Sequence, residues 1–486
     1  MGPPQAGAAV PVLLVGRRTR SHTQPRPDPP TGRSGPPHPL FFTTPILAPY
    51  FVNTDFQSIK GTFDILPDTA TTDGASPAPA STWRYVERVV HRVMARFNAE
   101  EIRTPVLEPT PLIARGIGAY TDIVSKEMFA FERGDTQYVL RPEVTAPVMR
   151  AYLQHHLDQR GGVQKLYYIG PCFRAERPQK GRYRQFHQFG AEIMGTDDPR
   201  ADAECIAMMQ AIYDEVGLTG LTLRLNSVGN PPSRARFVEA LQTYLQPYHS
   251  ELSETSRQRL ETNPLRILDT KNEHEQAILQ EAPVLLDFLD EESRTHYDTV
   301  KGLLDDLEVA YTEDPTLVRG LDYYTHTAFE LESDDLGAQS ALGGGGRYDL
   351  LAQELGSKQP VPSIGFASGI ERLLLAMEAQ DVEVPAKPTA DVFLAALGDE
   401  AERWVFRWAQ QLRAEGLAVA LDLRGRSLKA QMKEANRQEA PYTLIIGGNE
   451  LNTGRASVKE MATGEQEEVA FDALVDYLKG RLPAVA

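Results

Sequence analysis

The chain contains little cysteine and no long apolar run. Cys172 and Cys205 are the only cysteines among 486 residues, which excludes a disulfide framework and a zinc site of the CxxC type. Because free cysteines are typical of a reducing compartment, we expect a cytoplasmic protein. No apolar segment is long enough to span a bilayer, so we expect no membrane partner.

Several catalytic signatures are also missing. The ten histidines do not fall into metal-ligand spacing with cysteines or acids, and no serine nucleophile elbow occurs. The four glycines at 343–346 are not followed by the Lys-Ser/Thr of a phosphate-binding Walker loop. We therefore expect neither a metal site made of protein side chains nor covalent catalysis.

The formal net charge of −17 argues against nucleic-acid binding over the whole surface. Two local basic patches nevertheless occur, and one of them is the loop 177–184. The other has three-four spacing on one side of an expected helix and consists of Arg426, Lys429, Lys433 and Arg437. This second patch suits either an RNA backbone or plain contact with solvent.

Composition divides the chain into segments. Residues 1–54 are rich in Pro, Gly, Arg and Ser and cannot form a core. They are interpreted as a disordered or artefactual extension, with a transit peptide as the less favoured alternative. Residues 55–390 are expected to be one strand-rich domain, interrupted at about 231–313 by a helical insertion. Residues 391–486 alternate buried strands with helices, which predicts a compact α/β domain.

Two elements near the start of the strand-rich domain have clear patterns. From Trp83, apolar residues at three-four spacing up to Phe97 predict an amphipathic helix. The run 102–107, broken by Pro105, predicts a short edge strand. Further along, a strand is expected at 322–331.

The sequence FRAERPQKGRYRQFHQFGAE, at 173–192, predicts two strands joined by a basic loop. In the second strand Gln188, Glu192 and a phenylalanine share one parity, so their side chains project onto one face. Arg174 ends the first strand, where its planar guanidinium suits a phosphate. Such a surface fits a ligand with phosphates, an aromatic base and a cationic small molecule. Taken singly, the same residues also fit an ion pair between Arg174 and Glu176 and ordinary core packing.

Three more segments contribute candidate ligands. Glu143 and Thr145 follow a short strand-like run and either present acceptors to an ammonium group or cap a helix. The sequence RGLDYY brings an arginine and two tyrosines together, but Arg319 and Tyr324 have opposite strand parity. Both can reach one pocket only if Arg319 lies off the regular strand. Arg372 lies in the first turn of an expected helix, where it suits a phosphate tail.

Together these blocks resemble class II aminoacyl-tRNA synthetases, and specifically the histidyl-tRNA synthetase family. The resemblance runs from about Phe56 to the C-terminus. FRAERPQKGRYRQFHQFGAE is similar to motif 2 of that class, GFASGIERLLL to motif 3, and the helix from Trp83 with EIRTPVLEP to motif 1, the dimer element. LVRGLDYYT and GGGGRYD resemble the two signatures of the histidine enzymes. The implied fold is α+β: an antiparallel-sheet class II catalytic core with a helical insertion, followed by an α/β anticodon-binding domain.

The resemblance also implies roles for individual residues. Those implied for histidine are Glu143, Thr145, Arg174, Gln188, Glu192, Arg319, Tyr323, Tyr324 and Tyr348. Those implied for ATP are Arg174, Glu176, Arg182, Phe186 and Arg372. Those implied for tRNA are Gln179, Arg426, Lys429 and Lys433.

Within these sets some roles are specific. Arg174 and Arg319 would act in catalysis beside the α-phosphate. Glu192 and Tyr324 would bracket the imidazole ring, and a phenylalanine of motif 2 would stack on adenine. One departure is Val144, where bacterial relatives usually have glycine, but the ligand residues on either side of it are present.

The implied function is ATP-dependent ligation of L-histidine to histidine tRNA through a histidyl-adenylate, by a cytoplasmic homodimer that binds ATP with Mg²⁺. A non-catalytic regulatory paralogue from histidine biosynthesis is the nearest alternative, but such proteins lack the last domain and usually lose ligand arginines. A synthetase for another amino acid is disfavoured by Glu192 and the RGLDYY block. A pure RNA-binding module would leave the pocket residues unexplained.

Overall fold

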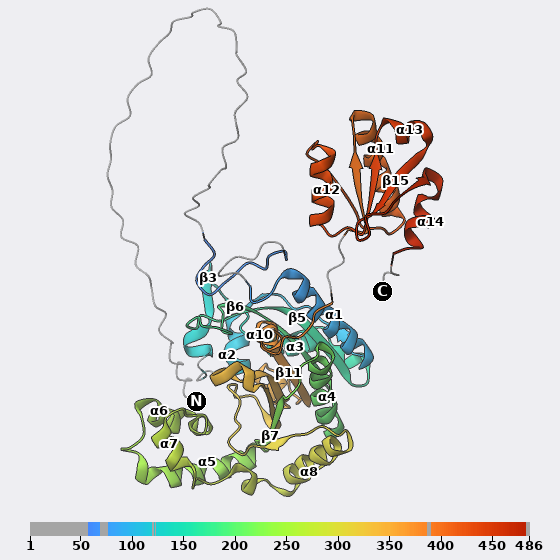
Figure 1. Cartoon of the computed structure of the whole chain (residues 1–486). Coiled ribbons are helices and arrows are strands. Elements are labelled where there is room, and N and C mark those ends of the chain that lie inside the picture. Colours follow the sequence, from blue (N-terminus) through green and yellow to red (C-terminus); the bar gives the residue numbers. More distant parts are fainter. Residues whose placement is uncertain (1–56, 69–75, 119–120, 122, 386–389, 483–486) are drawn as a thin grey trace, which may run out of the picture. The chain divides into compact units, whose positions relative to one another are not determined.

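The computed structural model describes residues 57–68, 76–118, 121, 123–385 and 390–482 (Figure 1). The expected extension at 1–54 lies outside the described residues. None of the described helices combines the length and the apolar character needed to cross a bilayer.

An eight-stranded sheet, built from strands between residues 100 and 369, forms the centre of this part of the chain (Figure 1). Its pairs are antiparallel except at the two edges, where β1 runs parallel to β5 and β8 runs parallel to β7. In spatial order the strands are β1 (Glu100–Glu101), β5 (Gln164–Phe173), β6 (Gln185–Met194), β11 (Ser363–Gly369), β10 (Ala341–Arg347), β9 (Thr325–Glu332), β7 (Thr222–Ser227) and β8 (Thr312–Glu313). The motif 2 hairpin predicted from the sequence is confirmed as β5 and β6.

Alternation along β6 gives the sheet two different faces. Phe189, Ala191 and Ile193 belong to a buried apolar cluster, whereas Gln188 and Glu192 point to the opposite face. The helices that contribute to this cluster are α1 (Ala80–Arg96), α4 (Pro199–Val216), α8 (Glu291–Asp306) and α10 (Ile370–Ala379). One face of the sheet is therefore sealed by helices, and the polar residues of β6 face the other way.

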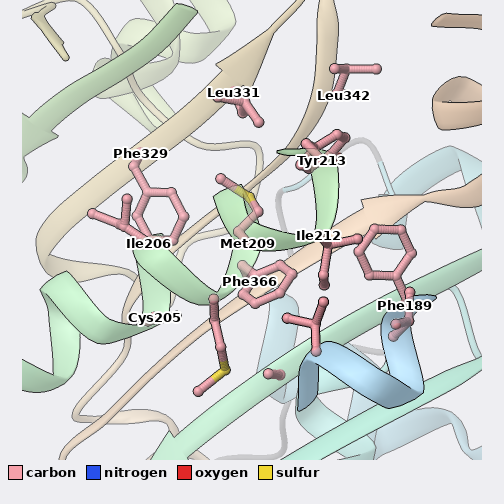
Figure 2. Packing of buried hydrophobic residues seen from close by; sticks show 14 of the residues in the cluster. Phe189, Cys205, Ile206, Met209, Ile212, Tyr213, Phe329, Leu331, Leu342 and Phe366 are labelled. Atoms are coloured by element: carbon pink, nitrogen blue, oxygen red, sulfur yellow. The ribbon is translucent and has the colours of Figure 1, made fainter. Parts of the chain in front are cut away.

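Helix α4 shows how the sealed face is built. Its N-cap Asp198 accepts from the backbone N–H of Arg200, Pro199 starts the helix, and Gly217 ends it with φ of 93°. Figure 2 shows its buried side chains packed against phenylalanines and leucines from the strands. The labelled residues are Phe189, Cys205, Ile206, Met209, Ile212, Tyr213, Phe329, Leu331, Leu342 and Phe366. Burial of each large side chain is worth about 1.5–3 kcal/mol, so this packing fixes the sheet under the site.

The region around Pro105 differs from the strand that the sequence predicts there. No strand runs through 102–107, because Pro105 has no N–H and the Thr104 carbonyl accepts from the Arg141 guanidinium at 2.9 Å. Pairing resumes in a three-stranded sheet, β2 (Leu107–Pro109), β4 (Thr136–Leu140) and β3 (Phe129–Arg133). Next to it lie α2 (Thr110–Ile117), α3 (Thr145–Gln154) and α9 (Leu351–Glu354), with a π turn at Ile123–Glu127 and a 3-10 turn at Leu157–Arg160.

The segment 231–313 is mostly helical, but its helices join two different clusters. Phe237, Leu241 and Leu260 pack in a cluster that also contains Tyr323, Tyr324 and Tyr348. Tyr297 and Val300 of α8 pack instead in the cluster under the sheet. The last helix therefore belongs to the main core. The other elements here are α5 (Pro231–Leu245), η3 (Gln246–Tyr248), α6 (Glu254–Thr262), η4 (Pro264–Ile267), α7 (Glu273–Leu279) and η5 (Leu285–Phe288), and η6 (Asp334–Gln339) follows β9.

The C-terminal segment is a five-stranded mixed sheet with helices. Its parallel strands β13, β12 and β14 were expected, whereas the hairpin of β15 and β16 was not, because its charged sequence hides the alternation. The strands are β12 (Val392–Ala396), β13 (Val419–Leu421), β14 (Tyr442–Ile446), β15 (Arg455–Glu460) and β16 (Gln466–Ala470). The helices are α11 (Asp399–Ala414), α12 (Leu428–Arg437), α13 (Gly448–Thr453), η7 (Phe471–Ala473) and α14 (Leu474–Lys479).

A buried ion pair joins α4 to the end of β10. The guanidinium of Arg347 pairs with Asp202, and both side chains are at most 1% exposed. His296 reaches the same carboxylate at 3.1 Å, and the Thr196 carbonyl accepts from Arg347 at 2.8 Å. The neighbouring cation lowers the pKa of Asp202 although burial opposes this.

Arg347→Ala is expected to lower the free energy of unfolding by about 3–5 kcal/mol, because it leaves the Asp202 carboxylate buried without its cation. Urea unfolding at neutral pH measures this difference. The control is Arg257→Ala, which removes an exposed ion pair with Glu254 and should cost about 1 kcal/mol or less. Equal losses in the two variants would show that Arg347 and Asp202 do not form a buried pair.

Candidate active site

The polar face of the sheet carries a cavity of about 740 Å³. Residues from the β5–β6 hairpin, the loop before β9, strand β10 and helix α10 line it. Of the residues implied for histidine and ATP, those that line the cavity are Glu143, Thr145, Arg174, Glu176, Arg182, Phe186, Gln188, Arg319, Tyr323, Tyr324, Tyr348 and Arg372. Glu192 is the exception, because it is fully buried and does not line the cavity.

Two hydroxyl groups hold Glu192. Thr145 donates to Oε1 at 2.8 Å, and the Tyr348 hydroxyl donates to Oε2. Since Thr145 and Tyr348 both line the cavity, their hydroxyls connect it to the buried carboxyl. Burial raises the pKa of Glu192 to about 8, and the hydroxyl donors lower it.

Glu143 caps the helix that supplies Thr145. Its two carboxylate oxygens accept from the backbone N–H groups of Thr145 and Ala146 at 2.8 and 2.9 Å, which are the first residues of α3. Burial raises the pKa of this carboxyl. The capping alternative is therefore confirmed, and it leaves the same carboxylate at the cavity wall. Val144 is 1% exposed and packs inward, so it does not displace its neighbours.

Arg174 is held at the end of β5. Its Nε donates to the Pro142 carbonyl at 3.1 Å, and its guanidinium lies 5.1 Å from the centre of the Phe186 ring. Glu176 pairs instead with Arg182 at 3.3 Å. The alternative of an Arg174–Glu176 ion pair is therefore wrong, and the Arg174 head group remains at the cavity.

Arg372 is anchored beside the motif 2 loop. It donates to the Gly181 carbonyl at 3.3 Å and to the Ala341 carbonyl at 2.5 Å. It is the third residue of α10, as the sequence predicted. The preceding Glu371 accepts from the backbone and the ring of His187, which ties α10 to the start of β6.

Arg319 and Tyr324 lie in the loop before β9, because that strand begins at Thr325 rather than at 322. The opposite strand parity of the two residues is therefore no obstacle, and both line the cavity. Arg319 pairs with Glu330 of β9. A Cβ on Gly344 would lie 3.1 Å from the Arg319 guanidinium carbon, and one on Gly346 would lie 2.8 Å from the Tyr324 ring. These two glycines of β10 therefore allow both side chains to rest on the sheet.

Three tyrosines form one wall of the cavity. The ring of Tyr323 lies 4.7 Å from that of Tyr324 and 5.6 Å from that of Tyr348, measured between centres. Burial raises the pKa of all three hydroxyls, so they remain protonated donors near neutral pH.

The Cys172 thiol orients the side chain of Gln188. It donates to Oε1 of Gln188 at 3.3 Å, which turns the amide nitrogen of Gln188 away from the thiol.

The structure adds lining residues that were not predicted. Arg224 of β7 pairs with Glu332 at 2.7 Å and with Asp314 at 2.9 Å, and all three line the cavity. Arg266 and Lys271 of the helical segment line it as well. Nothing in their local sequence marks them, since only the pairing of β7 with β9 and the fold of 231–313 bring them here.

The residues implied for tRNA lie elsewhere. Gln179 is exposed in the tight turn of the motif 2 loop. Arg426 precedes α12 and pairs with Asp422 and Glu434, so it is not on the helix as expected. Lys429 and Lys433 are exposed on α12. In the part of the chain that the structure describes, no group of three or more His, Cys, Asp or Glu side chains has an arrangement suited to a metal ion.

Comparison with known proteins agrees with this geometry. The family model for histidyl-tRNA synthetase matches residues 73–373, and that for the anticodon binding domain matches 391–481. A histidine--tRNA ligase of Chloroherpeton thalassium is 52% identical over 418 residues, covering 85% of this chain and 96% of that protein. A histidine--tRNA ligase of Synechocystis is 48% identical over 431 residues, covering 88% of this chain and 93% of that protein.

A solved structure of ligand-free histidyl-tRNA synthetase from S. aureus has a TM-score of 0.74 at 41% identity, covering 87% of this chain and 100% of that one. The antiparallel sheet, the cavity arginines and the C-terminal domain define a class II aminoacyl-tRNA synthetase. Within that class, the chain belongs to the histidyl-tRNA synthetase family.

Proposed function

We propose that this protein is a histidine--tRNA ligase that activates L-histidine with ATP and transfers it to histidine tRNA. The observation that carries the proposal is a single cavity lined by Arg174, Arg319 and Arg372, two of whose other lining residues hold the buried carboxyl of Glu192. The planar, charged guanidinium groups of arginine can form paired hydrogen bonds with the phosphates of a nucleotide. A carboxyl held in place by two hydroxyls can accept a hydrogen bond from the N–H of an imidazole.

In the first step, the histidine carboxylate attacks the α-phosphorus of ATP and pyrophosphate leaves. The negative charge that develops on the α-phosphoryl oxygens is stabilised by arginine groups that are already held in place. Pro142 fixes Arg174, and Glu330 fixes Arg319. Such preorganised charge costs no rearrangement at the moment of reaction. In the second step, a ribose hydroxyl of the tRNA terminus attacks the activated carbonyl and AMP leaves.

Selectivity for histidine rests on polar contacts to both ring nitrogens. Glu192 would accept from one ring N–H, and the Tyr324 hydroxyl would donate to the other nitrogen. A site that contains such buried polar groups rejects side chains that leave those groups unpaired, by factors of about 10⁴ or more. Glu143, Thr145 and Gln188 would bind the amino and carboxylate groups, and Phe186 would stack on adenine.

The remaining partners belong to the same proposal. ATP would enter as its Mg²⁺ complex, with Arg182 and Arg372 on the phosphate tail. The tRNA would meet Gln179 at its acceptor end and the C-terminal domain at its anticodon, where Lys429 and Lys433 supply exposed charge and Arg426 stands beside them. A cytoplasmic homodimer, with α1 as the dimer element, completes the proposal.

The test is an exchange of labelled pyrophosphate into ATP with each of the twenty amino acids in turn. We expect exchange with histidine alone, because only its side chain satisfies Glu192 and Tyr324 together. Charging of a histidine tRNA transcript then tests the second step. Equal exchange with another amino acid would overturn the substrate assignment, and no exchange at all would favour a non-catalytic paralogue.

A further inference from the structure

Tyr168 is a buried tyrosine of β5 that lies on the same face of the sheet as the cavity. It pairs with Gly190 of β6, between Gln188 and Glu192, and is 2% exposed. A Cβ on Gly190 would lie only 2.5 Å from the Tyr168 hydroxyl and 2.6 Å from its ring carbon Cζ. The glycine therefore lets the tyrosine lie flat across β6, with its hydroxyl among the residues that hold Glu192.

The hydroxyl of Tyr168 has no hydrogen-bond partner among the described residues. A buried hydroxyl without a partner costs about 1–3 kcal/mol, and phenylalanine would fill the same space without that cost. Buried polar groups of this kind call for an explanation. The hydroxyl lies next to Thr145 and Glu192, close enough to lower the pKa of the Glu192 carboxyl, although no hydrogen bond of good geometry joins it to either residue.

Glu192 has room for this third donor. Thr145 and Tyr348 each donate one hydrogen bond to one of its oxygens, and a carboxylate offers about four lone-pair sites. Burial raises the pKa of the Tyr168 hydroxyl well above its usual value, so it stays protonated and can donate. Burial also raises the pKa of Glu192 to about 8, so each donor that favours its ionised form matters near neutral pH.

We propose that Tyr168 is a histidine-positioning residue, whose hydroxyl donates to Glu192 in the histidine complex and keeps that carboxylate ionised and aligned for the imidazole N–H. This proposal rests on the proposed function. The ionisable groups on the same face of the sheet as the carboxyl that act on it are those of Glu143, Tyr168, Tyr323, Tyr324 and Tyr348. Among them Tyr168 is a phenol that the family resemblance did not assign to histidine.

The test is Tyr168→Phe, which removes one oxygen atom. We expect the KM for histidine in pyrophosphate exchange to rise about 10-fold near pH 7, the loss typical of one hydrogen bond to a charged group. The KM for ATP and the kcat should change less than about twofold, and the melting temperature should stay the same or rise. The pH at which histidine binding is half-maximal should move upward, because Glu192 then ionises at higher pH.

The matched control is Tyr297→Phe, at a tyrosine of α8 that is 1% exposed and whose hydroxyl donates to the Leu225 carbonyl. It should lose stability and leave the KM for histidine unchanged. Should Tyr168→Phe be unstable, Tyr168→Met replaces it and must show the same rise in histidine KM alone. An unchanged histidine KM across the pH range, or an equal rise in both KM values, would overturn the role of Tyr168. Absence of histidine-dependent exchange in the unmodified protein would instead overturn the proposed function.

Discussion

Replacing Arg319 with alanine is expected to lower the rate of histidyl-adenylate formation by about two to three orders of magnitude. Glu330 holds the guanidinium over Gly344, so its charge is in place before the α-phosphoryl group becomes more negative. Histidine affinity should change much less, because an interaction that strengthens in the transition state acts on the rate rather than on ground-state binding. Single-turnover adenylation measures the rate, and calorimetric titration measures the affinity.

Two further variants make this experiment decisive. Arg224→Ala removes another arginine of the same cavity, one that already pairs with Glu332 and Asp314, and should have a far smaller effect. Arg319→Lys keeps the charge but loses the planar fork and should recover only part of the rate. Urea unfolding of each variant detects any loss of stability from an unpaired Glu330. An unchanged single-turnover rate in a folded Arg319→Ala protein would refute the catalytic role.

Glu192→Gln is expected to raise the KM for histidine by about 100-fold or more, with little change in the KM for ATP. The substitution keeps the shape of the side chain, but it cannot form the carboxylate that the imidazole N–H would stabilise in the histidine complex, and loss of one charged partner in a buried site costs about 2–5 kcal/mol. The amide would also present N–H groups to hydroxyls that now donate to Glu192. Pyrophosphate exchange at varied histidine and varied ATP separates the two KM values.

The same variant should change how stability depends on pH. Burial raises the pKa of Glu192 from 4.5 to about 8, so between these values the folded protein holds a proton that the unfolded chain has lost. The free energy of unfolding therefore falls as pH rises through this window, by up to about 1.4 kcal/mol per pH unit. Glu192→Gln lacks this decline, so it should gain stability relative to the unmodified protein between pH 5 and pH 8.5.

Glu261→Gln, on the exposed surface of α6, is the control for both measurements. It should leave the histidine KM and the pH dependence of unfolding as they are. A Glu192→Gln protein with the histidine KM of the unmodified enzyme would show that the imidazole is bound elsewhere.

Much of this protein could be predicted from local sequence alone. The alternation in motif 2 predicted β5 and β6, the three-four spacing after Trp83 predicted α1, and the position of Arg372 at the start of α10 was correct. These features depend on periodicity within one element, which a single sequence contains. The identity of most residues at the cavity followed from the same blocks.

The tertiary structure alone determined which side chains from distant segments contact one another at the cavity. Glu192 is buried behind the residues that line the cavity, Glu330 holds Arg319, and Arg224 joins the cavity. All three results depend on how the strands pair across the sheet. The strand expected at 102–107 failed for a similar reason, because the Arg141 guanidinium takes a backbone carbonyl there. The sequence by itself determined the chemistry that meets at this site. Only the packing of segments far apart in the chain determined which groups touch, because hydrogen-bond partners and burial are properties of that packing.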